Sequence, residues 1–246
     1  RLTPWDFSMV QSTVPVIEID PSLGATTEID VRIGAKFLKS YESRNVVGYI
    51  RGTEQPDSFI VFTAHYDHLG RMGKTVYFPG ANDNASGIAM MLNLAKHYSA
   101  PENKPKYSIV FIAFSAEEVG LIGSNYFCQH PLFPLARIRF LINMDILGTG
   151  DEGITVVNAT LHNPEFRKMQ QINDSNSYLP LVKPRGKAAI SDNHFFTEKG
   201  VPCFYIYTLG GIKAYHDVCD RRDTLPLTEF DDLFRLIRDF TDWIME

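Results

Sequence analysis

Residues 107–114 constrain the fold of this chain more than any other stretch, because they are apolar at every position except Ser108. A strand that lacks alternation between apolar and polar residues is buried on both faces, which is typical of a parallel sheet covered by helices. Other runs rich in β-branched and aromatic residues predict further strands. These runs cover residues 14–19, 45–50, 59–64, 137–144, 154–157 and 201–207.

Helical patterns fill most of the intervals between these runs. The clearest covers residues 230–244, where Thr228 and Asp231 favour a helix start. Its apolar positions recur at helical spacing, at Phe230, Leu233, Phe234, Ile237, Phe240 and Ile244. Further helices are predicted at residues 85–98, 123–129, 164–173 and 192–199. Strands that alternate with helices predict an α/β fold of three layers, in which helices flank a mostly parallel mixed β-sheet.

The length of 246 residues and the hydrophobic content of 44% suit one folded domain with a sizeable core. Residues 1–40 fit the α/β pattern less well, because short strand-like pieces alternate there with polar turns. We therefore expect an N-terminal segment over residues 1–40 and the main α/β domain over residues 41–246. The chain begins with Arg1 rather than Met, so we expect that a preceding segment has been removed.

Composition argues against several kinds of partner and site. The net charge of -5 comes from mixed acidic and basic residues without a basic block, so no nucleic-acid partner is expected. No apolar run approaches the roughly 20 residues that cross a bilayer, so no membrane span is expected in this chain. Cys128, Cys203 and Cys219 form no CxxC pair, which argues against a thiolate metal site. Apolar surroundings predict that Cys128 and Cys203 are core residues.

Charged and imidazole side chains follow the predicted strands at the points where the strands end. Open α/β sheets bind ligands beyond the carboxyl ends of their strands, so we expect these side chains to converge on one rim. They are His65 and Asp67 after residues 59–64, Glu117 and Glu118 after residues 107–114, Asp145 after residues 137–144, His216 in the loop after residues 201–207, and Asp83 at the start of the helix over residues 85–98.

Each of these residues also has a simpler structural interpretation. A lone His65 is more often a hydrogen-bonded core histidine than a ligand, and Asp83 can cap a helix. Glu117 and Glu118 can begin a solvated helix, and Asp145 can cap a turn. Their joint placement favours a metal site, because the charge at one edge of the sheet requires counterions. Nitrogen and oxygen ligands without cysteine suit zinc first, with manganese or cobalt as substitutes.

Two such ions predict a hydrolase. A metal pair shares a bridging carboxylate, makes the proton of a water acidic and binds the attacking and departing oxygens. One carboxylate must remain off the ions to accept the proton of the water and pass it to the leaving amine. Neighbouring residues point in different directions, so one of Glu117 and Glu118 can be a ligand while the other faces the water.

At these residues the chain resembles the co-catalytic zinc aminopeptidase family, a bacterial leucyl-aminopeptidase-like group of exopeptidases with glutaminyl-cyclase relatives. The resemblance runs from about residue 45 to residue 246, and its motifs are highly specific in combination. They are His65-x-Asp67, Gly80-Ala81-Asn82-Asp83-Asn84-Ala85-Ser86-Gly87, Ser115-Ala116-Glu117-Glu118-x-Gly120-Leu121-x-Gly123-Ser124, Asn143-Met144-Asp145 and Tyr215-His216.

The resemblance implies a role for each matched residue and two zinc ions for each chain. It places His65 and Asp145 on one zinc ion, Glu118 and His216 on the other, Asp83 between both ions, and Glu117 as the general base.

Three further features are implied by the same resemblance. Asp67 is expected to orient His65, which suits the requirements of a metal-bound imidazole. Tyr215 is expected to stabilise a tetrahedral oxyanion, and packing against the loop of His216 is its alternative role. A cis peptide is expected between Asp83 and the residue that follows it.

The resemblance also implies peptide substrates with a free N-terminus. Residues 14–17 resemble the tail of a protease-associated domain, so residues 1–40 are interpreted as the remnant of such a domain. Bacterial relatives of this kind are commonly exported, so a periplasmic, cell-surface or secreted location is expected, with the signal segment absent from this chain.

The main alternative is a glutaminyl cyclase, an acyltransferase of the same scaffold that uses a single zinc ion. The cyclases resemble this chain at Asp83, Glu118 and His216, but they usually carry Trp where Tyr215 stands and lack the run of residues 120–124. A non-catalytic binding module is disfavoured by the intact ligand set. The preferred N-terminal residue, dipeptidase or carboxypeptidase specificity, and the oligomeric state stay open.

Overall fold

The computed structural model describes residues 28, 30, 38 and 40–246, and the strand predicted at residues 14–19 lies outside them. Within the described residues, seven strands form one mixed sheet, which confirms the predicted α/β class. Across the sheet they are β1 (Val46–Ile50), β5 (Tyr107–Phe114), β2 (Gln55–His65), β6 (Ile138–Met144), β9 (Cys203–Thr208), β7 (Ile154–Val157) and β8 (Val182–Pro184).

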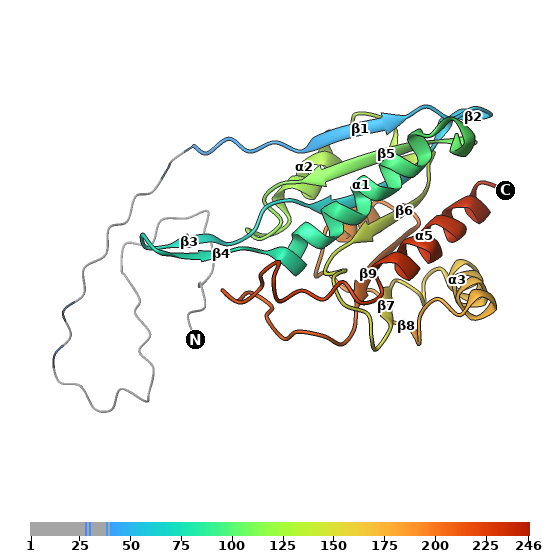
Figure 1. Ribbon diagram of the computed structural model, residues 1–246. Helices are drawn as coiled ribbons and strands as arrows, with labels where there is room; N and C mark the ends of the chain where they lie inside the picture. Colours follow the sequence, from blue (N-terminus) through green and yellow to red (C-terminus); the bar gives the residue numbers. More distant parts are fainter. Residues whose placement is uncertain (1–27, 29, 31–37, 39) are drawn as a thin grey trace.

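The centre of the sheet is parallel and its edges are mixed. Strands β5, β2, β6 and β9 are parallel neighbours, whereas β1 runs antiparallel to β5 and β7 antiparallel to β9. The carboxyl ends of the four parallel strands therefore meet at one edge of the sheet (Figure 1). This edge is where the sequence predicted a site.

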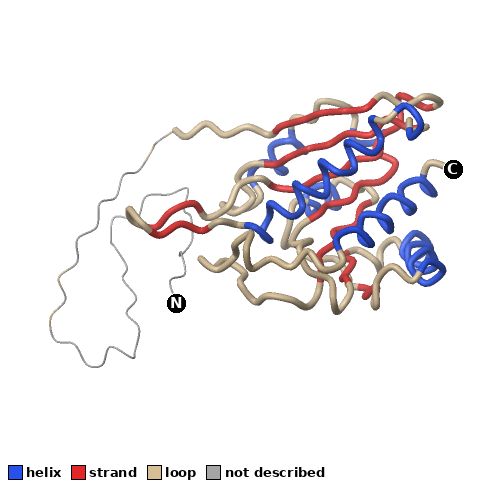
Figure 2. The backbone as a smooth tube through the Cα atoms, viewed as in Figure 1, coloured by secondary structure: helices blue, strands red, loops and turns tan. Residues whose placement is uncertain are grey.

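Helices cover both faces and complete the three predicted layers. The helices α1 (Ser86–Ser99), α3 (Asn163–Asn176) and α5 (Phe230–Ile244) contribute to one apolar cluster, and α2 (Ile122–Gln129) and α4 (Asn193–Glu198) contribute to the other. Figures 1 and 2 show α1 and α5 in front of the sheet, with α2 behind it. Ile60 and Phe62 belong to the first cluster, and Val61 between them belongs to the second. This alternation follows from the two-residue period of a strand.

Helix α5 is held by its apolar face rather than by a cap. Phe240 is fully buried, and its ring lies 5.6 Å from the ring of Phe140 and 5.7 Å from that of Phe204. Burying a phenylalanine side chain of this kind contributes roughly 1.5–3 kcal/mol. The predicted start at Thr228 is wrong, because Glu229 precedes the first helical residue and makes no side-chain capping bond in the described structure. Backbone hydrogen bonds hold the preceding loop instead, in which the N–H of Leu227 donates to the carbonyl oxygen of Gly148 at 2.9 Å.

Short elements escaped the sequence analysis. The strands β3 (Gly70–Met72) and β4 (Val76–Phe78) form a hairpin that stands out from the sheet edge in Figures 1 and 2. With β8, these are strands of three residues each, too short to show a period. In the part of the chain that the structure describes, no helix combines the length and apolarity that crossing a membrane requires.

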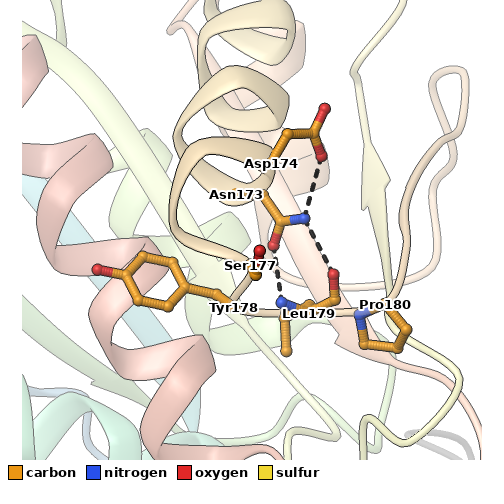
Figure 3. Close-up of a pocket in the computed structure, with 6 residues that line it drawn as sticks. All are labelled: Asn173, Asp174, Ser177, Tyr178, Leu179 and Pro180. Carbon is orange, nitrogen blue, oxygen red and sulfur yellow. Dashed lines mark hydrogen bonds between the residues drawn. The ribbon is translucent and has the colours of Figure 1, made fainter.

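A shallow pocket lies at the C-terminal end of α3 and is shown in Figure 3. The amide of Asn173 donates to the carbonyl oxygen of Leu179 at 3.0 Å and accepts the backbone N–H of Leu179 at 3.0 Å. Ser177 ends the helix in the left-handed conformation with φ of 53°. The polar groups of Asn173 are thus used to end the helix, and none of the pocket residues belongs to the predicted site.

All three cysteines lie in the described part of the chain and are free thiols. Burial raises the pKa of the Cys128 thiol to about 12 and also raises the pKa of Cys203, whereas Cys219 is exposed. We therefore expect one thiol per native chain to react rapidly with an aromatic disulfide reagent, and three in guanidinium chloride. The variant Cys219→Ser should lose the rapid phase. Rapid labelling of Cys128 or Cys203 in the native protein would contradict this assignment.

Candidate metal centre

His65 is the last residue of β2 and faces two carboxylates. Its Nε2 atom lies 3.2 Å from Oδ1 of Asp83 and 3.3 Å from Oδ1 of Asp145, which directly follows β6. The three side chains are almost fully buried. Strand ends separated by 80 residues in the sequence thus supply one imidazole and one carboxylate to the same point.

A second imidazole and carboxylate meet on the other side of Asp83. Nε2 of His216 lies 3.3 Å from Oδ2 of Asp83 and 3.1 Å from Oε2 of Glu118. Asp83 therefore lies between two sets of groups, and each of its two carboxylate oxygens faces a different histidine.

The turn that carries Asp83 is fixed by side-chain bonds to the backbone. The predicted cis peptide between Asp83 and Asn84 is present. The amide of Asn84 donates to the carbonyl oxygen of Met144 at 3.0 Å and accepts the backbone N–H of Gly87 at 2.9 Å. A Cβ atom at Gly87 would lie 2.4 Å from this amide oxygen, so glycine is required there. In the described structure no side chain caps the start of helix α1. The carboxylate of Asp83 is therefore not used as a helix cap and is available to contact the two histidines.

A buried chain of hydrogen bonds holds Asp145. The hydroxyl of Thr63 donates to the amide oxygen of Asn143 at 2.6 Å, and the amide nitrogen of Asn143 donates to the hydroxyl of Ser191 at 2.8 Å. Ser191 in turn donates to Oδ2 of Asp145 at 2.8 Å. The chain leaves Oδ1 of Asp145 facing His65.

Asp67 contacts both halves of the site. Its carboxylate oxygens accept the backbone N–H groups of Glu117 at 3.1 Å and Glu118 at 3.2 Å. The Nδ1 atom of His65 is closer to the backbone carbonyl of Asp67, at 3.0 Å, than to its carboxylate, at 3.7 Å. Asp67 is therefore positioned to orient His65 through its carbonyl group and the two glutamates through its carboxylate.

The electrostatics of the site favour bound cations. Burial lowers the pKa of His216, but hydrogen bonds to Asp83 and Glu118 outweigh it and raise the pKa to about 10. Burial raises the pKa of Glu117 to about 9, with further contributions from nearby carboxylates, including Asp145. Below that pH the metal-free carboxyl group is protonated, and neighbouring cations would shift it towards the ionised form.

Tyr215 stacks its ring on that of His216, with centroids 3.9 Å apart and planes 16° apart. Its side chain is 60% exposed, so the ring lies at the surface of the site. Partial desolvation at the rim of the site, together with the nearby carboxylates, raises the pKa of Tyr215. The hydroxyl thus stays protonated at neutral pH and can donate a hydrogen bond.

Sequence reasoning missed two residues that the fold brings to this centre. Nδ1 of His68 lies 2.7 Å from Oε1 of Glu118. Oδ1 of Asp220 accepts the backbone N–H of Asn82 at 2.7 Å, and Oδ2 accepts that of Asp83 at 3.0 Å. The sequence carried only weak signals for these two residues. His68 lies only three residues after the predicted ligand His65, and Asp220 lies in a polar loop without periodicity.

Replacement of Asp220 by Ala should lower the free energy of unfolding by about 2–4 kcal/mol, because it leaves two buried N–H groups without an acceptor. The measurement is urea denaturation of the metal-free chain. Asp223→Ala is the matched control, since Asp223 is exposed in the same loop and should change stability by less than about 0.5 kcal/mol. Equal stability of the two variants would refute the role of Asp220.

The fold is that of a class of α/β protein that includes zinc aminopeptidases. The zinc aminopeptidase BSAP from Bacillus subtilis superposes with a TM-score of 0.67 at 24% identity, covering 80% of this chain and 48% of that one. A glutaminyl cyclase from an Acidobacteriales bacterium superposes with a TM-score of 0.68 at 19% identity, covering 82% and 73%. At these identities the likeness establishes the fold alone.

The chain belongs to peptidase family M28, which its sequence matches over residues 45–241. Aminopeptidase YwaD of Bacillus subtilis is 34% identical over 145 residues, which are 56% of this chain and 30% of the relative. The chain spans less than a third of the length of the curated relatives that it matches.

Proposed function

We propose that this chain is a metal-dependent aminopeptidase that hydrolyses N-terminal peptide bonds with two zinc ions. The observation that carries the proposal is the position of Asp83, whose Oδ1 faces His65 and whose Oδ2 faces His216. A carboxylate that presents one oxygen to each of two imidazoles has the arrangement of a bridging ligand. In the single-zinc cyclase alternative, His65 and Asp145 would not be metal ligands.

The separations of the donor atoms fit zinc. In a tetrahedral site with bonds of about 2.0–2.1 Å, neighbouring ligand atoms lie about 3.3–3.4 Å apart. His65 and His216 each contact two carboxylates, and the nitrogen and oxygen atoms of these four pairs are 3.1–3.3 Å apart. His65, Asp145 and Asp83 would hold one ion, and Glu118, His216 and Asp83 would hold the other.

When bound, the two ions polarise the substrate carbonyl and make the attacking water more acidic. Glu117 accepts the proton of this water and delivers it to the amine nitrogen as the carbon–nitrogen bond breaks. Glu117 is half-buried beside Glu118, and the backbone N–H groups of both glutamates donate to the carboxylate of Asp67, which supports this role. Tyr215, at the surface of the same centre, donates to the oxyanion that develops on the carbonyl oxygen.

A free N-terminus has hydrogen-bond acceptors at this centre. Besides the proposed ligands, the carboxyl groups of Glu117 and Asp67 lie at the same rim, and an ionised carboxylate there can accept a hydrogen bond from an α-amine.

The test compares three substrates with the purified chain supplied with zinc. We expect hydrolysis of aminoacyl amides, no hydrolysis of the same compounds with an acetylated N-terminus, and no cyclisation of an N-terminal glutaminyl peptide. Cyclisation without hydrolysis would favour the cyclase, and cleavage of the acetylated substrates would contradict an aminopeptidase.

We also propose that residues 41–246 form the catalytic domain and that residues 1–40 are the remnant of a protease-associated domain. The match to the family over residues 45–241 supports the first part. A fragment of residues 41–246 should keep the zinc content and turnover of the whole chain. An exported location is proposed from the resemblance to bacterial aminopeptidases, and fractionation of the source cells tests it.

A further inference from the structure

His68 is held between the centre and the turn that carries Asp83. Its side chain is 9% exposed, and it follows β2 in the segment that leads to the hairpin. A Cβ atom at Gly80 would lie 2.6 Å from Cγ of the His68 ring, so the ring packs against the backbone there. Gly80 has a φ of +65°, which independently favours glycine. The His68 ring therefore lies against the backbone at Gly80, close to the turn that carries Asp83.

Glu118 divides its two oxygens between two histidines. Oε1 lies 2.7 Å from Nδ1 of His68, and Oε2 lies 3.1 Å from Nε2 of His216. The two imidazole rings meet edge to face, with centroids 5.9 Å apart. Each oxygen of the Glu118 carboxylate therefore contacts a different histidine.

The distance to His68 indicates a hydrogen bond rather than a shared ion. His68, Asp83 and Glu118 lie close enough together to form a possible set of metal ligands. Two ligands of one tetrahedral zinc ion lie about 3.3 Å apart, whereas hydrogen bonds to a carboxylate are about 2.7–2.9 Å long. The observed 2.7 Å between His68 and Glu118 matches the second value. Since an ionised carboxylate only accepts, Nδ1 carries the proton and donates.

On the basis of the proposed function, we propose that His68 is a positioning residue for the Glu118 ligand. The hydrogen bond from Nδ1 engages Oε1, and the other oxygen, Oε2, contacts His216. The Nε2 atom of His68 is buried and has no hydrogen-bond partner among the described residues. The bond to Glu118 is therefore the polar contact that orients this ring.

Zinc affinity tests the inference without relying on catalysis. Wild type, His68→Ala, His68→Asn and His68→Gln are titrated with zinc against a chromophoric chelator. Loss of a group that orients a metal ligand typically costs 10–100-fold in affinity, so His68→Ala should lose about that factor at one of two sites. Asn places an amide nitrogen at the position of Nδ1 and should recover most of the lost zinc affinity. Gln places it one bond further out and should restore less.

A double mutant separates positioning from general destabilisation. If His68 acts through Glu118, replacing His68 by Ala in the Glu118→Gln background should weaken zinc binding little further. Additive losses would overturn the inference, as would wild-type affinity in His68→Ala or failure of Asn to restore binding. If His68→Ala does not fold, the comparison of Asn with Gln decides. A wild-type chain that binds no zinc pair would overturn the proposed function itself, which distinguishes the two failures.

Discussion

The variant Glu117→Gln should lose about 10²- to 10⁴-fold in turnover of an aminoacyl substrate while keeping its zinc. The amide preserves the shape of the side chain and one hydrogen-bonding oxygen, but it cannot take the proton of the attacking water. The four contacts that His65 and His216 make with Asp83, Glu118 and Asp145 do not involve Glu117, so the zinc content should survive.

Glu118→Gln is the matched comparison, because it changes the adjacent residue by the same chemistry. Glu118 contacts His216 at 3.1 Å, and a neutral amide is a poorer ligand for a divalent cation than a carboxylate. This variant should lose zinc from one site. Near-normal turnover of Glu117→Gln, or loss of zinc as complete as that of Glu118→Gln, would show that the two roles are assigned wrongly.

Replacement of Asp83 by Asn should weaken both zinc sites at once, because each carboxylate oxygen faces a different histidine. Residues that merely orient a ligand contribute 10–100-fold to metal affinity. Loss of a ligand charge shared by two ions should therefore cost more than about 100-fold at each site. Turnover should then fall below about 1% of wild type at zinc concentrations that saturate the wild-type chain.

Asp145→Asn is the informative control for this prediction. Asp145 contacts His65 at 3.3 Å, and we assign it to one ion only, so its loss should remove one zinc ion and leave the other. Asp57→Asn, at a side chain that is 85% exposed, should change neither site. Retention of one tightly bound zinc ion in Asp83→Asn would show that Asp83 does not bridge.

The sequence alone was enough to predict which cysteines belong to the core. Cys128 and Cys203 were predicted to be small core residues from their apolar neighbours, and both are buried. The predicted helix start at Thr228 was wrong. A capping motif consists of only two side chains, and the path of the loop in the fold overrides it. The strands of three residues failed for a related reason, since a period cannot be read from so few positions.

The sequence by itself determined the layers of this protein and the strand ends that carry its charged groups. Both are local properties, because a buried parallel strand must be apolar throughout and polar residues at its end stand out against that background. The convergence of His65, Glu118 and Asp145 on one edge then follows from parallel neighbours, which the order of β5, β2 and β6 confirms.

Only the tertiary structure decided which atoms meet. Three sets of contacts join segments that are far apart in sequence. The oxygens of Asp83 contact two different histidines, Asp67 accepts two backbone N–H groups, and His68 donates to Glu118. The bond from the backbone of Asp83 to Asp220 spans 137 residues. Loops place these groups, and a loop conformation depends on contacts with the rest of the fold rather than on a repeating local pattern.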